Sequence, residues 1–190
     1  MLVLASSSAY RRSLLDRLHL PYSVVAANID ETAVPGERPA ATALRLAESK
    51  ARAVSAAFPA GIIIGSDQVA VLGSQPLGKP GTHPAALAQL MAMRGRSVVF
   101  HTALCVLDAA TGQCQLEDVP TTVTLRDYSE AQAVRYLERD RPYDCAGSAK
   151  IEAMGIALVE RVVSNDPTAL IGLPLIALVT MLKRAGVEVL

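Results

Sequence analysis

The sequence predicts an α/β fold, with a mixed sheet flanked by helices, and three observations support this prediction. The chain has 190 residues and is 51% hydrophobic, so it can bury a substantial core. A β-branched run such as Ile62-Ile63-Ile64 cannot alternate between core and solvent, which is typical of a strand covered on both faces. Segments with apolar residues at helical spacing alternate with such runs. We expect one domain over residues 1–190, since no repeat, low-complexity tract or long linker divides it.

The charge balance argues against several kinds of partner. Lys+Arg and Asp+Glu are 18 each, so the formal net charge is zero and no broad positive surface for nucleic acid or anionic membrane is expected. The apolar runs are too short to span a bilayer, and Arg11 and Arg12 follow the N-terminal apolar residues, the reverse of a secretory signal. We therefore expect a cytoplasmic protein with no nucleic-acid and no membrane partner. Cys105, Cys114 and Cys145 are widely spaced, which argues against a disulfide framework or a zinc site.

The N-terminal segment predicts a strand, a loop and a helix. Leu2 to Ala5 is an apolar run, Ser6 to Ser8 are good N-caps, and the residues after them carry leucines at helical spacing. A helix start offers free N–H groups and a positive dipole end, so this loop, with Arg11 and Arg12, is a candidate anion site. Plain capping with two solvated arginines is the alternative interpretation.

Two further segments carry candidate ligands. Tyr22 to Ala27 predicts a second strand, and the loop after it carries Asp30 and Glu31. Carboxylates are the ligands that a hard divalent cation prefers, although loop acids are often only solvated. A helix is predicted from Pro39 to Phe58, with Lys50 on its apolar face. Lys50 either extends to the rim of the core or points into a cleft as a fixed cation, and the alanine-rich face favours the cleft.

The central strand, Gly61 to Val69, carries the principal candidate, and the extended run continues through Leu72 after it. It delivers Asp67, followed by Gln68, where the helical cover of the strand is expected to stop. Ligands of open α/β sheets bind beyond the carboxyl ends of the strands, so both residues are site candidates. An aspartate that only caps the next turn is the alternative. Gln75 to Gly81 predicts a turn, in which Lys79 suits either a phosphate contact or an ordinary exposed position.

The second half of the chain changes from βα units to an antiparallel pair with helices. The predicted elements are a helix from Thr82 to Arg94, strands from Ser97 to Leu107 and Cys114 to Leu125 joined by a hairpin, a helix from the capping box at Ser129 to Asp140, a helix from Leu173 to Arg184, and a last strand from Val187 to Leu190. Strand alternation over residues 145–152 would place Ser148, Lys150 and Glu152 on one face, which is either solvent-exposed or the wall of a pocket.

Together these residues resemble the Maf family of nucleoside triphosphate pyrophosphatases over essentially the whole chain. The motifs that carry the resemblance are Ala5-Ser6-Ser7-Ser8 with Arg11-Arg12, Asp30-Glu31-Thr32, Ala47-Glu48-Ser49-Lys50-Ala51, Gly65-Ser66-Asp67-Gln68 and Gly78-Lys79-Pro80. Further along, the segments Cys145-Ala146-Gly147-Ser148 with Lys150 and Glu152, then Asp166-Pro167 and Gly172-Leu173-Pro174, are similar to the branch that prefers 7-methyl-GTP.

The resemblance implies an elongated mixed sheet with two lobes and a central cleft, often in a homodimer. It also implies hydrolysis of a nucleoside triphosphate between the α and β phosphates. Asp67 would take the proton from the attacking water, and Glu31 with Asp67 would hold a Mg²⁺ or Mn²⁺ ion. The phosphate contacts would come from Ser7, Arg11, Arg12, Lys50 and Lys79. The base would be recognised by Tyr10, Gln68 and Glu152, with a cation–π contact between Tyr10 and the charged 7-methylguanine.

Three alternatives stand beside this interpretation. The first is a dTTP or UTP pyrophosphatase of the same family, and the second is a non-catalytic nucleotide-binding regulator of cell division. The intact set of cations and acids favours an enzyme; its members are Arg12, Glu31, Lys50, Asp67 and Lys79. Nucleic-acid binding through the same cleft is the third, which the neutral charge and the 4% aromatic content disfavour.

Overall fold

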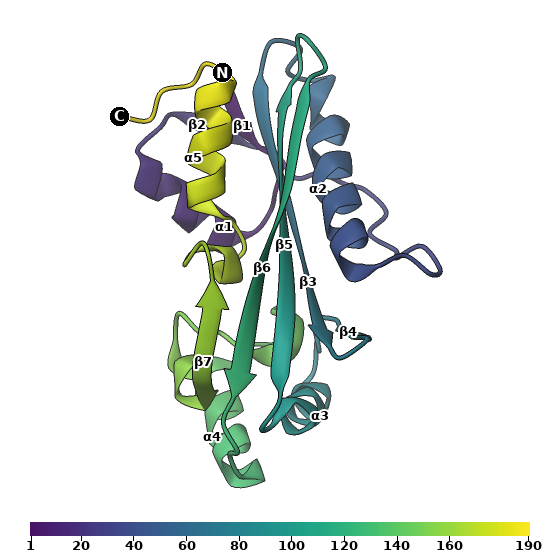
Figure 1. Cartoon of the computed structure of the whole chain (residues 1–190), viewed down its shortest axis with the longest axis vertical. Helices are drawn as coiled ribbons and strands as arrows, with labels where there is room; N and C mark the ends of the chain where they lie inside the picture. Colours follow the sequence, from purple (N-terminus) through teal and green to yellow (C-terminus); the bar gives the residue numbers. More distant parts are fainter. The chain divides into compact units, whose positions relative to one another are not determined.

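The structure is a computed structural model that describes all 190 residues (Figure 1). Seven strands form a mixed sheet in the order β2-β1-β3-β5-β6-β7, with β4 paired to β3. The strands are β1 (Leu2–Leu4), β2 (Tyr22–Val24), β3 (Ile62–Leu72), β4 (Gln75–Leu77), β5 (Ser97–Asp108), β6 (Cys114–Leu125) and β7 (Val159–Ser164). The α-helices are α1 (Ala9–Leu15), α2 (Pro39–Ser55), α3 (His83–Met93), α4 (Glu130–Asp140) and α5 (Leu175–Arg184), and the short 3-10 helices are η1 (Asp16–Leu18), η2 (Ala146–Ser148), η3 (Met154–Leu158) and η4 (Ala169–Ile171). The predicted α/β fold class is confirmed.

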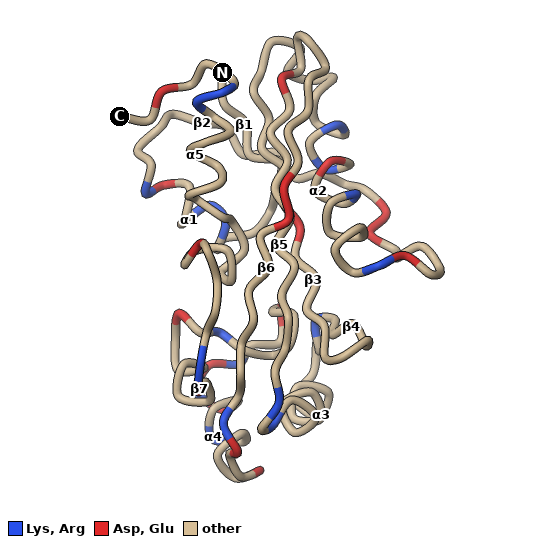
Figure 2. The backbone as a smooth tube through the Cα atoms, viewed as in Figure 1, with Lys and Arg blue, Asp and Glu red and all other residues tan.

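The chain divides into two compact units. The first contains residues 1–68, 102–119 and 166–190, and the second contains residues 69–101 and 120–165. The strands β3, β5 and β6 therefore contribute residues to both units. Figure 2 shows that positions of positive and negative residues are interspersed along the backbone of each unit, as the zero net charge leads one to expect. The two lobes with a central cleft stay a prediction of the resemblance.

The first unit has a layer of helices on each face of its strands. Strand β1 pairs in parallel with β2 on one side and with β3 on the other. One face packs against α1 and α5, and Leu4, Ile64 and Leu178 belong to the same buried core cluster. Helix α2 lies on the other face, as Figure 1 shows. The predicted burial of β3 follows, since Ile63 and Ile64 point to opposite faces and both are fully buried.

Helix α2 approaches β3 most closely at Gly65. A Cβ atom at this position would lie 2.1 Å from the carbonyl oxygen of Ala47 and 3.1 Å from the Cβ of Ala51. The glycine therefore permits the backbone of the helix to lie against the strand. Because Lys50 belongs to the same turn of α2, this contact also sets its height above the strand.

The second unit is built around α3, α4 and the remaining strand segments. Helix α3 packs on α4, and the buried Tyr128 donates its hydroxyl to the carbonyl oxygen of Leu90 at 2.6 Å. Strand β7 pairs antiparallel with β6, from Thr121 opposite Ser164 to Leu125 opposite Val159.

Several predicted elements are confirmed in detail. The hairpin between β5 and β6 is closed by the Asp108 N–H, which donates to the Gln113 carbonyl oxygen at 2.9 Å. The capping box at Ser129 is present, with the Ser129 N–H donating to the Gln132 side chain at 2.8 Å. Thr82 caps α3 as predicted.

Two predicted strands are wrong. Residues 145–152 form η2 followed by a turn, because Gly147 and Ser148 have positive φ angles of 71° and 56°, which an extended strand cannot accommodate. Residues 187–190 form no strand; Val187 instead donates its N–H to the Leu182 carbonyl oxygen beyond the end of α5. Strand β2 is also shorter than the predicted run to Ala27, and β4 lies within the predicted turn.

No helix combines the length and the apolar composition needed to cross a membrane. All three cysteines are free thiols, yet the Sγ atoms of Cys105 and Cys114 lie 3.2 Å apart near the β5–β6 hairpin, a pairing that their spacing did not suggest.

Candidate functional site

Three parallel strands bring polar loops to one edge of the first unit. The loop Ser6 to Ser8 follows β1, the acidic loop with Glu31 follows β2, and Ser66, Asp67 and Gln68 lie along β3 just beyond its pairing with β1. Parallel strands end at the same edge of a sheet, which is where α/β proteins bind ligands. The sequence placed its principal candidates at this edge.

Alternation along β3 sends these three side chains to opposite faces. Ile63, Gly65 and Asp67 point toward α2, whereas Ser66 and Gln68 point toward the segment of residues 166–174. The strand thus holds the candidate catalytic acid on one face and organises a supporting loop with the other.

Asp67 lies in a buried ion pair. The Nζ atom of Lys50 donates to Asp67 Oδ1 at 2.6 Å and lies 2.8 Å from Glu31 Oε1. The Lys50 and Asp67 side chains are 9% and 10% exposed, while Glu31 is 54% exposed. Lys50 therefore points into the site and not to the rim of the core, and one ammonium bridges the two acids.

A second ionic cluster fixes the acidic loop against α2. Arg45 donates from Nε and Nη2 to the two carboxylate oxygens of Glu37, each at 2.8 Å, and Nη2 also reaches the Thr32 carbonyl oxygen at 3.2 Å. These hydrogen bonds lower the pKa of Glu37 to about 2. Because Thr32 follows Glu31 directly, Arg45 restrains the backbone that carries this acid.

The other face of β3 holds the loop that ends in Gly172. The Gly172 carbonyl oxygen accepts from Ser66 Oγ at 2.9 Å and from Arg11 Nε at 2.8 Å. The Gln68 amide nitrogen donates to Thr102 Oγ1 at 2.9 Å and to the carbonyl oxygens of residues 169 and 170 at 3.2 and 3.0 Å. The nitrogen of Gln68 is therefore used within the protein.

Asp166 shapes this loop from within. Its carboxylate accepts from the Thr168 N–H at 2.9 Å, the Thr168 hydroxyl at 2.7 Å and the Ile176 N–H at 2.7 Å. The bond from Ile176 satisfies one of the free N–H groups at the start of α5. The loop is thus anchored at its start by Asp166 and at its end by the Gly172 carbonyl.

The guanidinium of Arg11 lies in the field of both acids. Burial lowers the pKa of Arg11, and the negative charges of Asp67 and Glu31 oppose that shift. Its Nη1 reaches Ser6 Oγ at 3.5 Å, a long hydrogen bond. The Gly172 carbonyl oxygen thus holds Arg11, whose positive charge interacts with Asp67 and Glu31.

The other predicted site residues are distributed over both units. In the first unit, Ser7 and Arg12 are exposed and Tyr10 is half-buried. Lys79 and Glu152 are exposed and belong to the second unit. The structure therefore brings together Arg11, Glu31, Lys50 and Asp67, and the roles of Ser7, Tyr10, Arg12, Lys79 and Glu152 stay predictions.

Sequence reasoning missed four residues that support the site. Arg45, Glu37 and Thr102 were given no role, and Ser66 was noted only within its motif. A serine between a buried glycine and a buried aspartate on a central strand was a usable signal, because a buried hydroxyl needs a partner. Nothing local indicated the partner, which lies 106 residues away.

The donor set at the site fits a divalent cation that also binds substrate. Glu31 and Asp67 both lie within hydrogen-bond distance of one nitrogen atom, so their oxygens converge on a common point. No group of three or more His, Cys, Asp or Glu side chains could hold a metal ion alone. Mg²⁺ commonly uses one or two carboxylates and completes its shell with waters and substrate phosphates, so two converging acids suffice.

Comparison with known proteins identifies the family. The family model described as "Maf-like protein" matches residues 1–185. A protein of Cupriavidus metallidurans named 7-methyl-GTP pyrophosphatase is 59% identical over 97% of this chain and 93% of its own length. Proteins of the same name from Thiobacillus denitrificans and Ralstonia nicotianae are 58% and 60% identical, over 100% and 96% of this chain and 94% of their own length in each case. The order of motifs, the acid-bearing strand and this match over nearly every residue agree, and the chain belongs to the Maf family.

Proposed function

We propose that this protein hydrolyses 7-methyl-GTP to 7-methyl-GMP and pyrophosphate. The observation that carries the proposal is the cluster of Lys50, Asp67 and Glu31 at the strand edge, in a chain that shares 58–60% of its residues with relatives named for this activity. The intact acids and cations favour catalysis over nucleotide binding alone.

Asp67 acts as the general base in this proposal. Its carboxylate accepts a proton from a water molecule while the water oxygen forms a bond to the α phosphorus. The bond between the α phosphorus and the bridging oxygen breaks, and pyrophosphate leaves with the electron pair. Lys50 donates a hydrogen bond to Asp67 Oδ1 at 2.6 Å, and this contact fixes the orientation of the carboxylate that takes the proton.

The triphosphate is bound by the positive groups around this acid. Arg11 is held by Gly172 and Ser6, so its direction is set before substrate arrives. Arg12 and the exposed Ser7 extend the contact surface of the same loop, and Lys79 is a further phosphate contact in the proposal. Fixed charged donors of this type typically contribute about 10²-fold or more in rate each.

Glu31 and Asp67 would hold a Mg²⁺ or Mn²⁺ ion in the catalytic complex. When bound, such an ion neutralises negative charge on the phosphates. Lys50 contacts the same two acids, so its one positive charge offsets part of their negative charge.

Base preference depends on the positive charge that N7 methylation gives to guanine. Tyr10 offers an aromatic face for a cation–π contact worth about 0.5 to 2 kcal/mol, and Glu152 accepts from the N–H edge of the base. Gln68 acts as a positioning residue, because its amide nitrogen already holds residues 169 and 170. We also expect a cytoplasmic homodimer, as the resemblance and the charge pattern predict.

Pyrophosphate release from five substrates tests the proposal. We expect 7-methyl-GTP to exceed GTP, UTP, dTTP and CTP in kcat/KM with Mg²⁺ or Mn²⁺, and Asp67→Asn to abolish turnover of all five. Glu152→Ala should lower activity on 7-methyl-GTP far more than on UTP, whereas Glu160→Ala, which removes an exposed acid from β7, should change neither. Preference for UTP or dTTP would refute the substrate and leave the chemistry. No turnover of any substrate would favour a nucleotide-binding regulator.

A further inference from the structure

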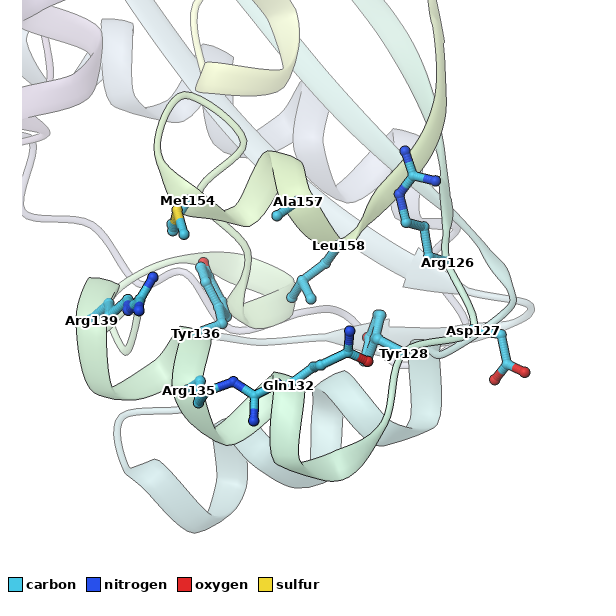
Figure 3. A pocket seen from close by; sticks show the side chains of 10 residues that line it. All are labelled: Arg126, Asp127, Tyr128, Gln132, Arg135, Tyr136, Arg139, Met154, Ala157 and Leu158. Carbon is cyan, nitrogen blue, oxygen red and sulfur yellow. The ribbon is translucent and has the colours of Figure 1, made fainter.

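A polar groove lies in the second unit, and none of its lining residues is assigned to the proposed active site. It has a volume of about 230 Å³ and lies between α4, the η3 segment and the residues that follow β6 (Figure 3). Its lining residues are Arg126, Asp127, Tyr128, Gln132, Arg135, Tyr136, Arg139, Met154, Ala157 and Leu158. All ten belong to the second unit, so the groove is defined within one compact body.

The charge of this groove is positive and uncompensated. Arg126, Arg135 and Arg139 are exposed, and the side chain of each lacks any ion pair or hydrogen bond within the protein. The one acid in the lining, Asp127, is already paired with Arg94. Arg135 and Arg139 lie four residues apart on α4 and therefore point from the same side of the helix.

The floor of the groove is apolar, because its polar atoms are already bonded. The hydroxyl of Tyr128 donates to the Leu90 carbonyl oxygen, and the hydroxyl of Tyr136 accepts from the Lys150 N–H at 2.8 Å. Tyr128, Tyr136 and Leu158 are only 3%, 4% and 4% exposed, so they close the bottom of the groove, and the exposed apolar side chain at its rim is that of Met154, at 43%. Figure 3 shows these side chains between the arginines of α4 and Arg126.

The architecture of the groove is also fixed by backbone contacts. The Arg126 N–H donates to the Leu158 carbonyl oxygen at 2.8 Å, which ties the residues after β6 to η3. Gln132 uses its Oε1 atom to accept from Ser129 at the start of α4. The two walls are therefore held at a set spacing before any ligand arrives, a condition that reduces the cost of binding.

We propose that this groove binds a small phosphate monoester with a flat, ring-containing body, of the size of a nucleoside monophosphate. A phosphate monoester carries about −1.5 to −2 charges at pH 7 and three acceptor oxygens, which match unpaired guanidinium groups. The ring contacts the exposed apolar side chains of Met154 and Ala157, above the buried tyrosine and leucine floor. The volume is below the range of about 300 to 1,000 Å³ that is typical of pockets for drug-sized ligands, so the groove favours a ligand no larger than a mononucleotide.

The binding of GMP by the full-length protein tests this proposal, with NMR signals of the arginine side chains as the local readout. We expect GMP to shift the signals of Arg135 and Arg139 with saturation, and Arg135→Gln/Arg139→Gln to weaken this binding about 10-fold or more. A charge-matched control, Arg161→Gln/Arg184→Gln, removes two exposed arginines outside the groove and should leave the affinity unchanged. Equal weakening in the control would overturn the proposal, because it would indicate only a general charge effect.

Ligand fragments test the two halves of the groove. At the concentration at which GMP saturates the change in the arginine signals, guanosine should give no saturable change. Inorganic phosphate should bind more weakly than GMP. If guanosine bound as tightly as GMP, the role of the arginines would be overturned. Comparison of 7-methyl-GMP with UMP distinguishes the source of the ligand: preference for the first indicates the product of the proposed reaction, and equal affinity indicates monophosphates in general. The proposal does not depend on hydrolysis. A 10-fold rise in KM for 7-methyl-GTP in Arg135→Gln/Arg139→Gln would overturn it, because such a rise would indicate that the groove is part of the active site.

Discussion

The close contact between Gly65 and α2 predicts a large effect of one added methyl group. In Gly65→Ala the new Cβ would lie 2.1 Å from the Ala47 carbonyl oxygen and 3.0 Å from the Ala51 nitrogen, and no side-chain rotation can move either backbone atom. The helix must withdraw by about 1 Å to restore normal contact. Overpacking of this kind costs about 1 to 3 kcal/mol, and a backbone clash belongs at the upper end, about 3 kcal/mol. For a chain of this length that corresponds to a fall in Tm of about 6 to 12 °C.

Thermal unfolding followed by circular dichroism measures this change, and Gly78→Ala is its matched control. Gly78 has no heavy atom within 4 Å of an added Cβ, so its Tm should stay within about 2 °C of the unchanged protein. Adding Ala51→Gly to Gly65→Ala removes the 3.1 Å contact with the Ala51 Cβ but leaves the clash with the Ala47 oxygen, so it should not restore the Tm. Full rescue by Ala51→Gly, or a Tm of Gly65→Ala near that of the control, would refute the reasoning. Since Lys50 moves with α2, turnover should also fall by about 10²-fold.

Three further outcomes follow from the charges and thiols of the first unit. Lys50→Met should destabilise the protein by about 3 to 5 kcal/mol because it leaves Asp67 buried without its cation, and adding Asp67→Asn should restore much of this loss in urea unfolding; equal instability of both variants would contradict it. The pKa of Glu37 is lowered to about 2 by Arg45, so its contribution to stability is present above the unfolded pKa, about 4.3, and is lost as the pH falls through 2. Glu37→Gln should therefore lower the urea midpoint at pH 7 and converge with the unchanged protein near pH 2, and a gap that persists there would argue against the ion pair. Burial raises the pKa of Cys105, so a thiol reagent at pH 8 should label it only as fast as the protein unfolds; mass spectrometry that finds labelling at the rate of a free cysteine would exclude this.

The parallel strands of the first unit could be predicted because their signals are local. Three consecutive isoleucines indicated a strand covered on both faces, and the motif after them indicated Asp67 as the acid that it carries. The predicted position at the strand end is wrong, because β3 continues to Leu72 and pairs there with β4. The Ser6 to Ser8 loop and the Ser129 capping box were visible for the same reason, since a cap and the N–H group that it satisfies lie within a few residues.

The failures occurred where backbone angles or distant contacts override the local pattern. The alternation of residues 145–152 is consistent with a strand, but the positive φ angles of Gly147 and Ser148 fold it into turns. Strand β7 was not predicted, because its pattern of mostly exposed residues lacks alternation and it is defined by pairing with β6. A strand that is specified mainly by pairing with its neighbour is difficult to predict from its own sequence.

The site showed the same division between local and distant information. Its acids and cations could be named from their motifs, but their pairing could not. Lys50 and Asp67 are 17 residues apart, and Gln68 binds a loop more than 100 residues further on. The alternation of side chains along β3 accounts for this division. The type of each residue suggested its role, whereas the face of the strand on which it lies determined its partner.

Lys50 and the two arginines of α4, Arg135 and Arg139, differ in burial, and that difference explains why Lys50 is paired with acids and the arginines are not. The Lys50 side chain is 9% exposed, and a charge removed from water is costly unless an opposite charge lies close, as Asp67 and Glu31 do. Arg135 and Arg139 remain hydrated and can stay unpaired at little cost. A phosphate that reaches Lys50 must therefore compete with two carboxylates, and this competition is what a divalent cation on Glu31 and Asp67 would relieve. A phosphate that binds in the groove between α4 and η3 would displace only water, because Arg135 and Arg139 have no carboxylate partner there. The zero net charge of the whole chain is compatible with both proposed anion sites, because each depends on the balance of charge within a few ångströms and not on the total.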